Sequence, residues 1–94
     1  MVKHIVCFKM DSEENAIKAK EILLSMIGKV PTAKKIEVGL DFLHSARSFD
    51  VILLVDLEDK LALEEYQKDD YHCSVVKTFM QAHTKSSVAV DYEF

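Results

Sequence analysis

The alternation of apolar and polar positions along the chain predicts four β-strands. The first, Val2–Met10, and the third, Phe49–Leu57, are apolar on both faces along their middle. The second, Ile36–Phe42, and the fourth, Ser86–Phe94, alternate apolar positions with more polar ones, which is typical of half-buried strands. A run that is apolar on both faces indicates a strand covered from two sides.

Apolar steps of three and four residues predict a helix that begins at Glu13. Asp11 or Ser12 supplies the N-cap, and Gly28 and Pro31 mark the end of the helical segment. One stripe of this helix is expected to face the core, formed by Ala16, Ala19, Leu23, Met26, Ile27 and Val30.

A second helical region lies between the third and fourth strands, in the stretch LALEEYQKDDYHCSVVKTF. The pattern predicts one helix over Leu61–Lys68, a break at Asp69–Asp70, and another helix from about Tyr71 to Met80. Ala82–Lys85 is then expected to connect to the last strand. Tyr66 and His72 lie on either side of the break, each on an otherwise apolar helix face, so this region is the first place to look for a polar site.

The predicted order of strand, helix, strand, strand, helix, strand is that of the α+β ferredoxin-like βαββαβ fold. Its four-stranded antiparallel sheet carries the helices on one face, with the first and third strands in the centre. A lone copy would leave Ile5, Cys7 and one face of Val51–Val55 in water. Because burying a Val or Leu side chain contributes about 1.5–3 kcal/mol, we expect a homodimer through the open sheet face, which makes a dimeric α/β barrel.

Length and composition narrow the class of protein. The 94 residues predict one domain, 1–94, and a net charge of −4 argues against a nucleic-acid partner. The longest apolar run, Val51–Val55, is too short to cross a membrane, and MVKHIVCFKM has no signal-peptide pattern. Two scattered thiols, Cys7 and Cys73, match neither a CxxC motif nor a zinc site. We therefore expect a cytoplasmic protein.

Four segments together resemble the stress-responsive α/β-barrel (Dabb) domain family: VKHIVCFK, DVILLV, LEEYQKDDYHCSVV and VDYE. The resemblance runs over nearly the whole chain and implies a dimeric barrel of two ferredoxin-like subunits. Many members have no assigned activity. A plant branch with similar motifs, of the olivetolic acid cyclase type, consists of polyketide cyclases that use no cofactor.

In that branch a first-strand His, a helical Tyr and a His six residues later line the pocket, and the matching positions here are His4, Tyr66 and His72. The resemblance implies a catalytic role for these three residues. The family's segment after the Tyr reads His-Pro-x-His, whereas this chain has Asp69-Asp70-Tyr71-His72. Only the last His is kept, which changes the charge and the backbone at the pocket entrance.

Such a set suits general acid–base chemistry on a carbonyl compound. His72 would remove a proton next to the carbonyl, Tyr66 would hold the developing enolate oxygen, and His4 would position or share the proton. The structural alternative is that His72 buttresses the helix break while Tyr66 and His4 are satisfied core residues. The functional alternatives are a non-catalytic binding or structural protein of the stress response and a cofactor-free monooxygenase.

No metal or other cofactor is expected. His72 and His83 would lie roughly 16 Å apart on a continuous helix, too far to share an ion. Asp69 and Asp70 are more readily explained as helix caps than as ligands. A small-molecule ligand is the expected partner of the pocket.

Overall fold

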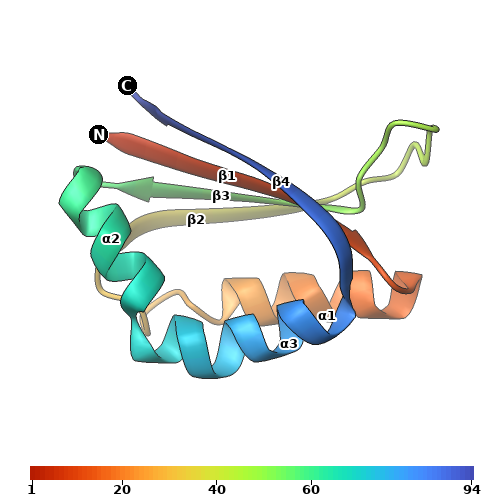
Figure 1. Cartoon of the computed structure of the whole chain (residues 1–94), viewed down its shortest axis with the longest axis horizontal. Helices are drawn as coiled ribbons and strands as arrows, with labels where there is room; N and C mark the ends of the chain where they lie inside the picture. The colour runs from red at the N-terminus through yellow and green to blue at the C-terminus, as the bar shows by residue number, and fades with distance from the viewer.

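The computed structural model describes residues 1–94 and confirms the ferredoxin-like fold. The strands form one antiparallel sheet in the order β2-β3-β1-β4, and the helices cover one of its faces (Figure 1). The central strands are therefore β1 and β3, as their apolar pattern predicted. The elements are β1 (Val2–Met10), α1 (Glu13–Leu24), β2 (Ala33–Leu40), β3 (Val51–Leu57), α2 (Lys60–Lys68), the π-helical turn η1 (His72–Val76), α3 (Lys77–His83) and β4 (Thr84–Glu93).

Alternation along the central strands separates a covered face from an open one. On β3 the side chains of Val51, Leu53, Val55 and Leu57 point toward the helices and are at most 2% exposed. They belong to a single cluster of 15 buried apolar side chains that also takes in one stripe of α1 and the inner faces of α2 and α3. Burial of this cluster is the main favourable contribution to the stability of the fold.

The first helix is capped as predicted but is shorter than its apolar stripe. Ser12 is the N-cap, and its Oγ accepts a hydrogen bond of 3.1 Å from the Asn15 amide. The helix ends at Leu24, and the chain then turns through Gly28, whose φ of +81° is readily adopted only by glycine. The prediction that Ile27 is buried was wrong, because the turn rotates its side chain outward to 61% exposure.

The second helical region is more continuous than predicted. The chain breaks only at Asp69, whose Oδ1 accepts a hydrogen bond of 3.1 Å from the His72 amide, so Asp69 is the cap of the second segment. Helix then continues through η1 and α3 to His83, and β4 begins at the next residue. The predicted connection at Ala82–Lys85 was therefore wrong.

The second strand also begins earlier and ends earlier than its pattern indicated. It spans Ala33–Leu40, because its first residues pair with the end of β3 through an irregular register step. Phe42, predicted as its last residue, instead lies in the loop that follows and is 89% exposed.

The open face of the sheet carries a continuous apolar surface. In the strand register, Ile5 lies between Leu54 of β3 and Val90 of β4, and Cys7 lies between Ile52 and Val88. No element covers this side (Figure 1). None of the helices is long and apolar enough to span a membrane. We call this surface the open-face patch; it consists of Ile5, Cys7, Ile52, Leu54, Val88, Val90 and Tyr92.

Candidate functional site

A cavity of about 490 Å³ lies on the helix-covered side of the sheet and brings together all three predicted site residues, His4, Tyr66 and His72. Its walls come from β1, β3, β4 and every helix of the chain. The apolar wall consists of Val6, Phe8, Leu23, Leu53, Tyr66, Val76 and Met80. The polar lining consists of His4, Gln67, His72, Lys77, Gln81, Thr84 and Ser87.

His4 is positioned by the pairing of the first and last strands. It lies directly opposite Asp91 on β4, and its Nδ1 makes a close hydrogen bond with the Asp91 carboxylate. The imidazole is 8% exposed. Because a carboxylate only accepts hydrogen bonds, this contact places a proton on Nδ1 and leaves Nε2 as the ring nitrogen without a protein partner.

Tyr66 lies between the two histidines and is fully buried. Its ring meets His4 edge-on at a centroid distance of 5.6 Å and lies 4.6 Å from the His72 ring. The hydroxyl donates to Met26 Sδ over 3.7 Å, and Met26 is outside the cavity lining. Burial raises the pKa of Tyr66 well above its ordinary value, and the charge of Asp69 adds to this increase. Tyr66 therefore presents its ring, as a neutral phenol, to the two imidazoles.

His72 lies at the start of η1 and is held in an apolar setting. Its Nδ1 is buried and makes no hydrogen bond. Burial lowers the pKa of His72, and positive charge at Lys77 and His4 lowers it further. The charge of Asp69 and the backbone of Gln67 oppose the decrease in this pKa. Since Nδ1 is inaccessible, Nε2 is the ring nitrogen through which His72 can contact a molecule in the cavity.

The structure adds residues that the sequence had not singled out. Asp91 was visible only as one acid in the last strand, and its pairing with His4 depends on the β1–β4 register. Lys77 lines the cavity because of the π-helical turn, which the sequence pattern does not predict. No group of three or more His, Cys, Asp or Glu side chains is arranged to hold a metal ion.

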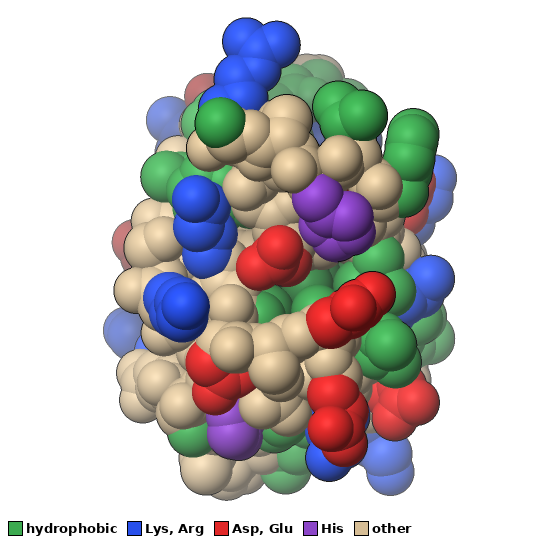
Figure 2. Space-filling model, turned by 90° about the vertical axis from the view of Figure 1, so that its right-hand side faces the viewer, with side chains coloured by type: hydrophobic (Ala, Val, Ile, Leu, Met, Phe, Trp, Pro, Cys, Tyr) green, Lys and Arg blue, Asp and Glu red, His purple; other side chains and the backbone are tan.

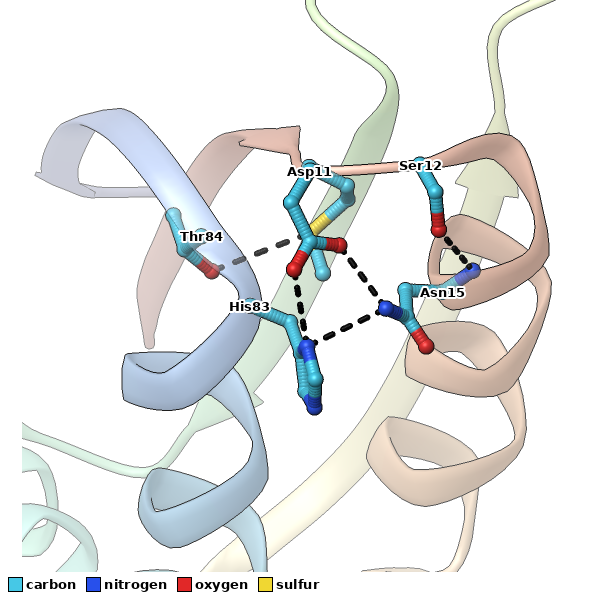
Figure 3. Close-up of polar contacts among 6 residues, drawn as sticks. Asp11, Ser12, Asn15, His83 and Thr84 are labelled. Atoms are coloured by element: carbon cyan, nitrogen blue, oxygen red, sulfur yellow. Dashed lines mark hydrogen bonds and ion pairs between the residues drawn. The ribbon is translucent and has the colours of Figure 1, made fainter.

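A second Asp–His pair lies outside the cavity. Asp11 Oδ2 is 2.8 Å from His83 Nδ1, and Asp11 Oδ1 accepts a hydrogen bond of 2.8 Å from the Asn15 side chain (Figure 3). These contacts lower the pKa of Asp11. The hydrogen bond from Asn15 has the largest effect, and the hydrogen bond with His83 has the next largest. The cluster joins the end of α3 to the start of α1, and it offers a matched comparison for the His4–Asp91 pair.

A second hollow, of about 430 Å³, opens at the end of the molecule that carries the 41–50 loop. It has a hydrophobic floor and acidic side chains around it (Figure 2). Two of its three carboxylates already have partners: Asp50 accepts from the Met10 amide at 2.8 Å, and Asp41 accepts from the His44 amide at 2.7 Å. These contacts fix the ends of the loop, so we assign this hollow a structural role.

Comparison with solved structures supports the fold. A dimeric protein of unknown function with a ferredoxin-like fold from Bacteroides fragilis has 26% identity, covering 99% of this chain and 95% of that one, with a TM-score of 0.82. A dimeric ferredoxin-like protein of unknown function from Thermobifida fusca has 19% identity, 99% and 90% coverage, and a TM-score of 0.85. The hydroxynitrile lyase of Passiflora edulis has 16% identity, 97% and 90% coverage, and a TM-score of 0.80.

Comparison at the sequence level gives the family. A search of curated protein sequences finds no match. The family model for the stress-responsive A/B barrel domain matches residues 2–94. This match covers the three strands and all helical segments that form the cavity. The chain therefore belongs to the stress-responsive A/B barrel domain family.

Proposed function

We propose that the chain forms a homodimer through the open-face patch and that each subunit binds a small carbonyl compound in its cavity. The dimer is supported by the exposure of Val88, Val90 and Tyr92, which lies between 45% and 61% in a single copy. It is also supported by the dimeric neighbours from Bacteroides fragilis and Thermobifida fusca. The patch and the cavity are on opposite faces of the sheet, so sheet-to-sheet packing would leave the cavity open.

In our proposal the cavity performs cofactor-independent proton transfer, and the His4–Asp91 pair is the observation that carries it. Asp91 holds the proton on Nδ1 of His4, so the lone pair on Nε2 faces the cavity. This nitrogen takes a proton from the carbon next to a carbonyl, and the C–H electron pair moves into the carbonyl to form an enolate. His4 becomes an imidazolium, which the Asp91 carboxylate stabilises.

We assign His72 the role of hydrogen-bond donor to the developing enolate oxygen. An imidazole whose Nδ1 is buried without a partner resists a second proton, which agrees with the lowered pKa of His72. The neutral ring then carries its proton on Nε2 and donates it as a hydrogen bond into the cavity. His4 thus takes the role of base that the sequence had suggested for His72, and His72 takes the role of holding the enolate oxygen that it had suggested for Tyr66.

Tyr66 has a different task in this scheme from the one expected. Because its hydroxyl donates to Met26, we assign the ring, and not the hydroxyl, to the site. The ring fixes the relative orientation of His4 and His72 by contacting both. Either the imidazolium of His4 then returns its proton to the carbon, or the enolate attacks a second carbonyl of the same molecule and the resulting alkoxide takes the proton from His4. The second outcome is the ring closure expected of a cyclase.

The neighbour from Passiflora edulis is a lyase by name, so an enzyme of that class is compatible with the fold. The alternative is a binding protein that uses the same cavity without chemistry. The two differ in one observable quantity, which is the rate at which a bound ketone exchanges its α-protons with solvent.

The test uses 4-oxopentanamide, a neutral methyl ketone, dissolved in D₂O with the purified protein. Proton NMR follows the loss of the signals next to the ketone, and oxygen uptake is recorded to detect monooxygenase chemistry. We expect exchange above the buffer rate, reduced by roughly 10²-fold or more in His4→Gln and His72→Gln. The control is His44→Gln, an exposed histidine outside the cavity. Binding without exchange would support the binding-protein alternative and overturn the acid–base assignment.

A further inference from the structure

The charge of the cavity lining differs from that of the whole chain. The chain has 16 acidic and 12 basic side chains, giving a net charge of −4. The cavity lining contains one lysine, Lys77, and no Asp or Glu. Lys77 makes no ion pair with the protein and lies at the exposed rim. An unpaired cation at the edge of a pocket whose lining has no acidic side chain favours a ligand with negative charge.

The π-helical turn is what brings Lys77 to the same cavity as His72. In an α-helix each residue turns by about 100°, so residues five apart point about 140° away from each other. In η1 the amide of Lys77 donates to the carbonyl of His72, a step of five residues, which brings these positions back toward one side. Both side chains accordingly line the cavity.

Other contacts indicate where an anionic group would lie. Lys77 and His72 line the same cavity, and the charge of Lys77 lowers the pKa of His72 whereas that of Asp69 raises it. Gln81 lies four residues after Lys77, one turn along the same helix, and also lines the cavity. An ammonium and a side-chain amide one turn apart provide hydrogen-bond donors for both oxygens of a carboxylate.

We propose that the ligand is a carbonyl compound that also carries a carboxylate, with the carboxylate at Lys77 and Gln81 and the carbonyl at His72 and His4. The proposal rests on the proposed function for the reacting carbonyl. It adds the substrate class: an oxo-acid anion is preferred to the corresponding neutral amide. The volume of about 490 Å³ leaves room for both groups in one small molecule.

The experiment compares 4-oxopentanoate with 4-oxopentanamide, which differ only in the anionic group. Dissociation constants for both are measured by NMR titration at low ionic strength, with wild type, Lys77→Gln and the control Lys29→Gln. Lys29 is exposed and outside the cavity lining. We expect wild type and Lys29→Gln to bind the anion about fivefold or more tightly than the amide, with the preference decreasing as salt is added. In Lys77→Gln the preference is lost, because the affinity for the anion falls to about that for the amide.

The outcomes separate this inference from the proposed function. Equal affinity of the wild type for the two ligands, or an anion preference that persists in Lys77→Gln, overturns the inference. If the anion preference depends on Lys77 but neither ligand exchanges its α-protons, the anion site stands and the acid–base function fails. If the amide exchanges and no anion preference exists, the proposed function stands alone.

Discussion

His4 and Asp91 lie opposite each other on neighbouring antiparallel strands, and the carboxylate holds Nδ1 of the imidazole. The pair joins the first and last strands of the chain on the face that borders the cavity. His4 is buried, whereas the Asp91 side chain is 40% exposed, so the carboxylate keeps part of its hydration. The strand register places Asp91 opposite His4, and their contact leaves Nε2 as the ring nitrogen without a protein partner.

Asp91→Asn tests the importance of this pair for proton transfer. The amide oxygen of the variant accepts only a weaker hydrogen bond from Nδ1 of His4, and the neutral amide does not stabilise an imidazolium. We therefore expect proton exchange of the neutral ketone to fall by roughly 10²-fold. The matched control is Asp11→Asn, which removes the carboxylate of the His83 pair outside the cavity. Equal rates in Asp91→Asn and Asp11→Asn would contradict the role given to Asp91.

Tyr66→Phe is expected to change the response of the fold to alkaline pH. Because the folded-state pKa of Tyr66 is raised, the folded protein keeps a proton that the unfolded chain releases above about pH 10. The free energy of unfolding of the wild type should therefore decrease above that pH, and the variant should lack this component. Near neutral pH the variant should lose less than about 1.5 kcal/mol, since its hydrogen bond ends on a weak sulfur acceptor. Urea unfolding at pH 7.5 and 10.5 measures both effects, and an identical alkaline decrease in the two proteins would speak against the buried phenol.

His72→Gln is expected to change the response to acid. The folded-state pKa of His72 is lowered from its ordinary value of 6.5. As the pH falls below 6.5, the unfolded chain therefore binds a proton at His72 more readily than the folded protein does. The contribution of His72 to stability is therefore intact above that pH and is lost as the pH falls. Between pH 7.5 and 5 the wild type should lose more unfolding free energy than His72→Gln, with His44→Gln behaving like the wild type. If the wild type lost less unfolding free energy than His72→Gln, the pKa of His72 would be raised in the folded protein. That result would contradict the prediction.

Val90→Lys tests the homodimer. Val90 is 61% exposed in a single copy and lies beside Ile5 in the open-face patch. A lysine there would bring a charge into a sheet-to-sheet interface while leaving the helix-covered core unchanged. Light scattering after size exclusion should give a dimer of this 10.7-kDa chain for the wild type and a folded monomer for the variant. Val75→Lys on η1, 41% exposed and away from the patch, should remain dimeric. A monomeric wild type at micromolar concentration would refute the dimer.

The fold could be read from the sequence because its main determinants are local. The two-sided apolar runs of β1 and β3 identify the central strands, and Ser12 and Asp69 act as caps at the places where their residue types predict them. The end of α1 could not be predicted, since the apolar stripe continues through the turn that exposes Ile27. Similarly, the end of α3 depends on how β4 pairs with β1 and not on a local stop signal.

The candidate site was only partly predictable for a related reason. Tyr66 and His72 were singled out by the apolar faces around the helix break, and His4 was added by the family resemblance. The structure places all three on one cavity. Asp91 could not be assigned, because its partner is 87 residues away and the choice depends on a strand register. Lys77 was missed because helical periodicity assumes 3.6 residues per turn, which the π-helical turn does not follow.

The account depends on two imidazoles that line the same cavity, the buried His4 and the half-buried His72, and carry their protons on opposite nitrogens. Two-dimensional ¹H–¹⁵N NMR of the histidine rings at pH 7.5, with signals assigned by His4→Gln and His72→Gln, reports this directly. We predict that His4 is protonated on Nδ1 with a free Nε2, and that His72 is neutral and protonated on Nε2. A His4 ring that carries its proton on Nε2 alone, or a His72 ring that is a cation at this pH, would contradict the account.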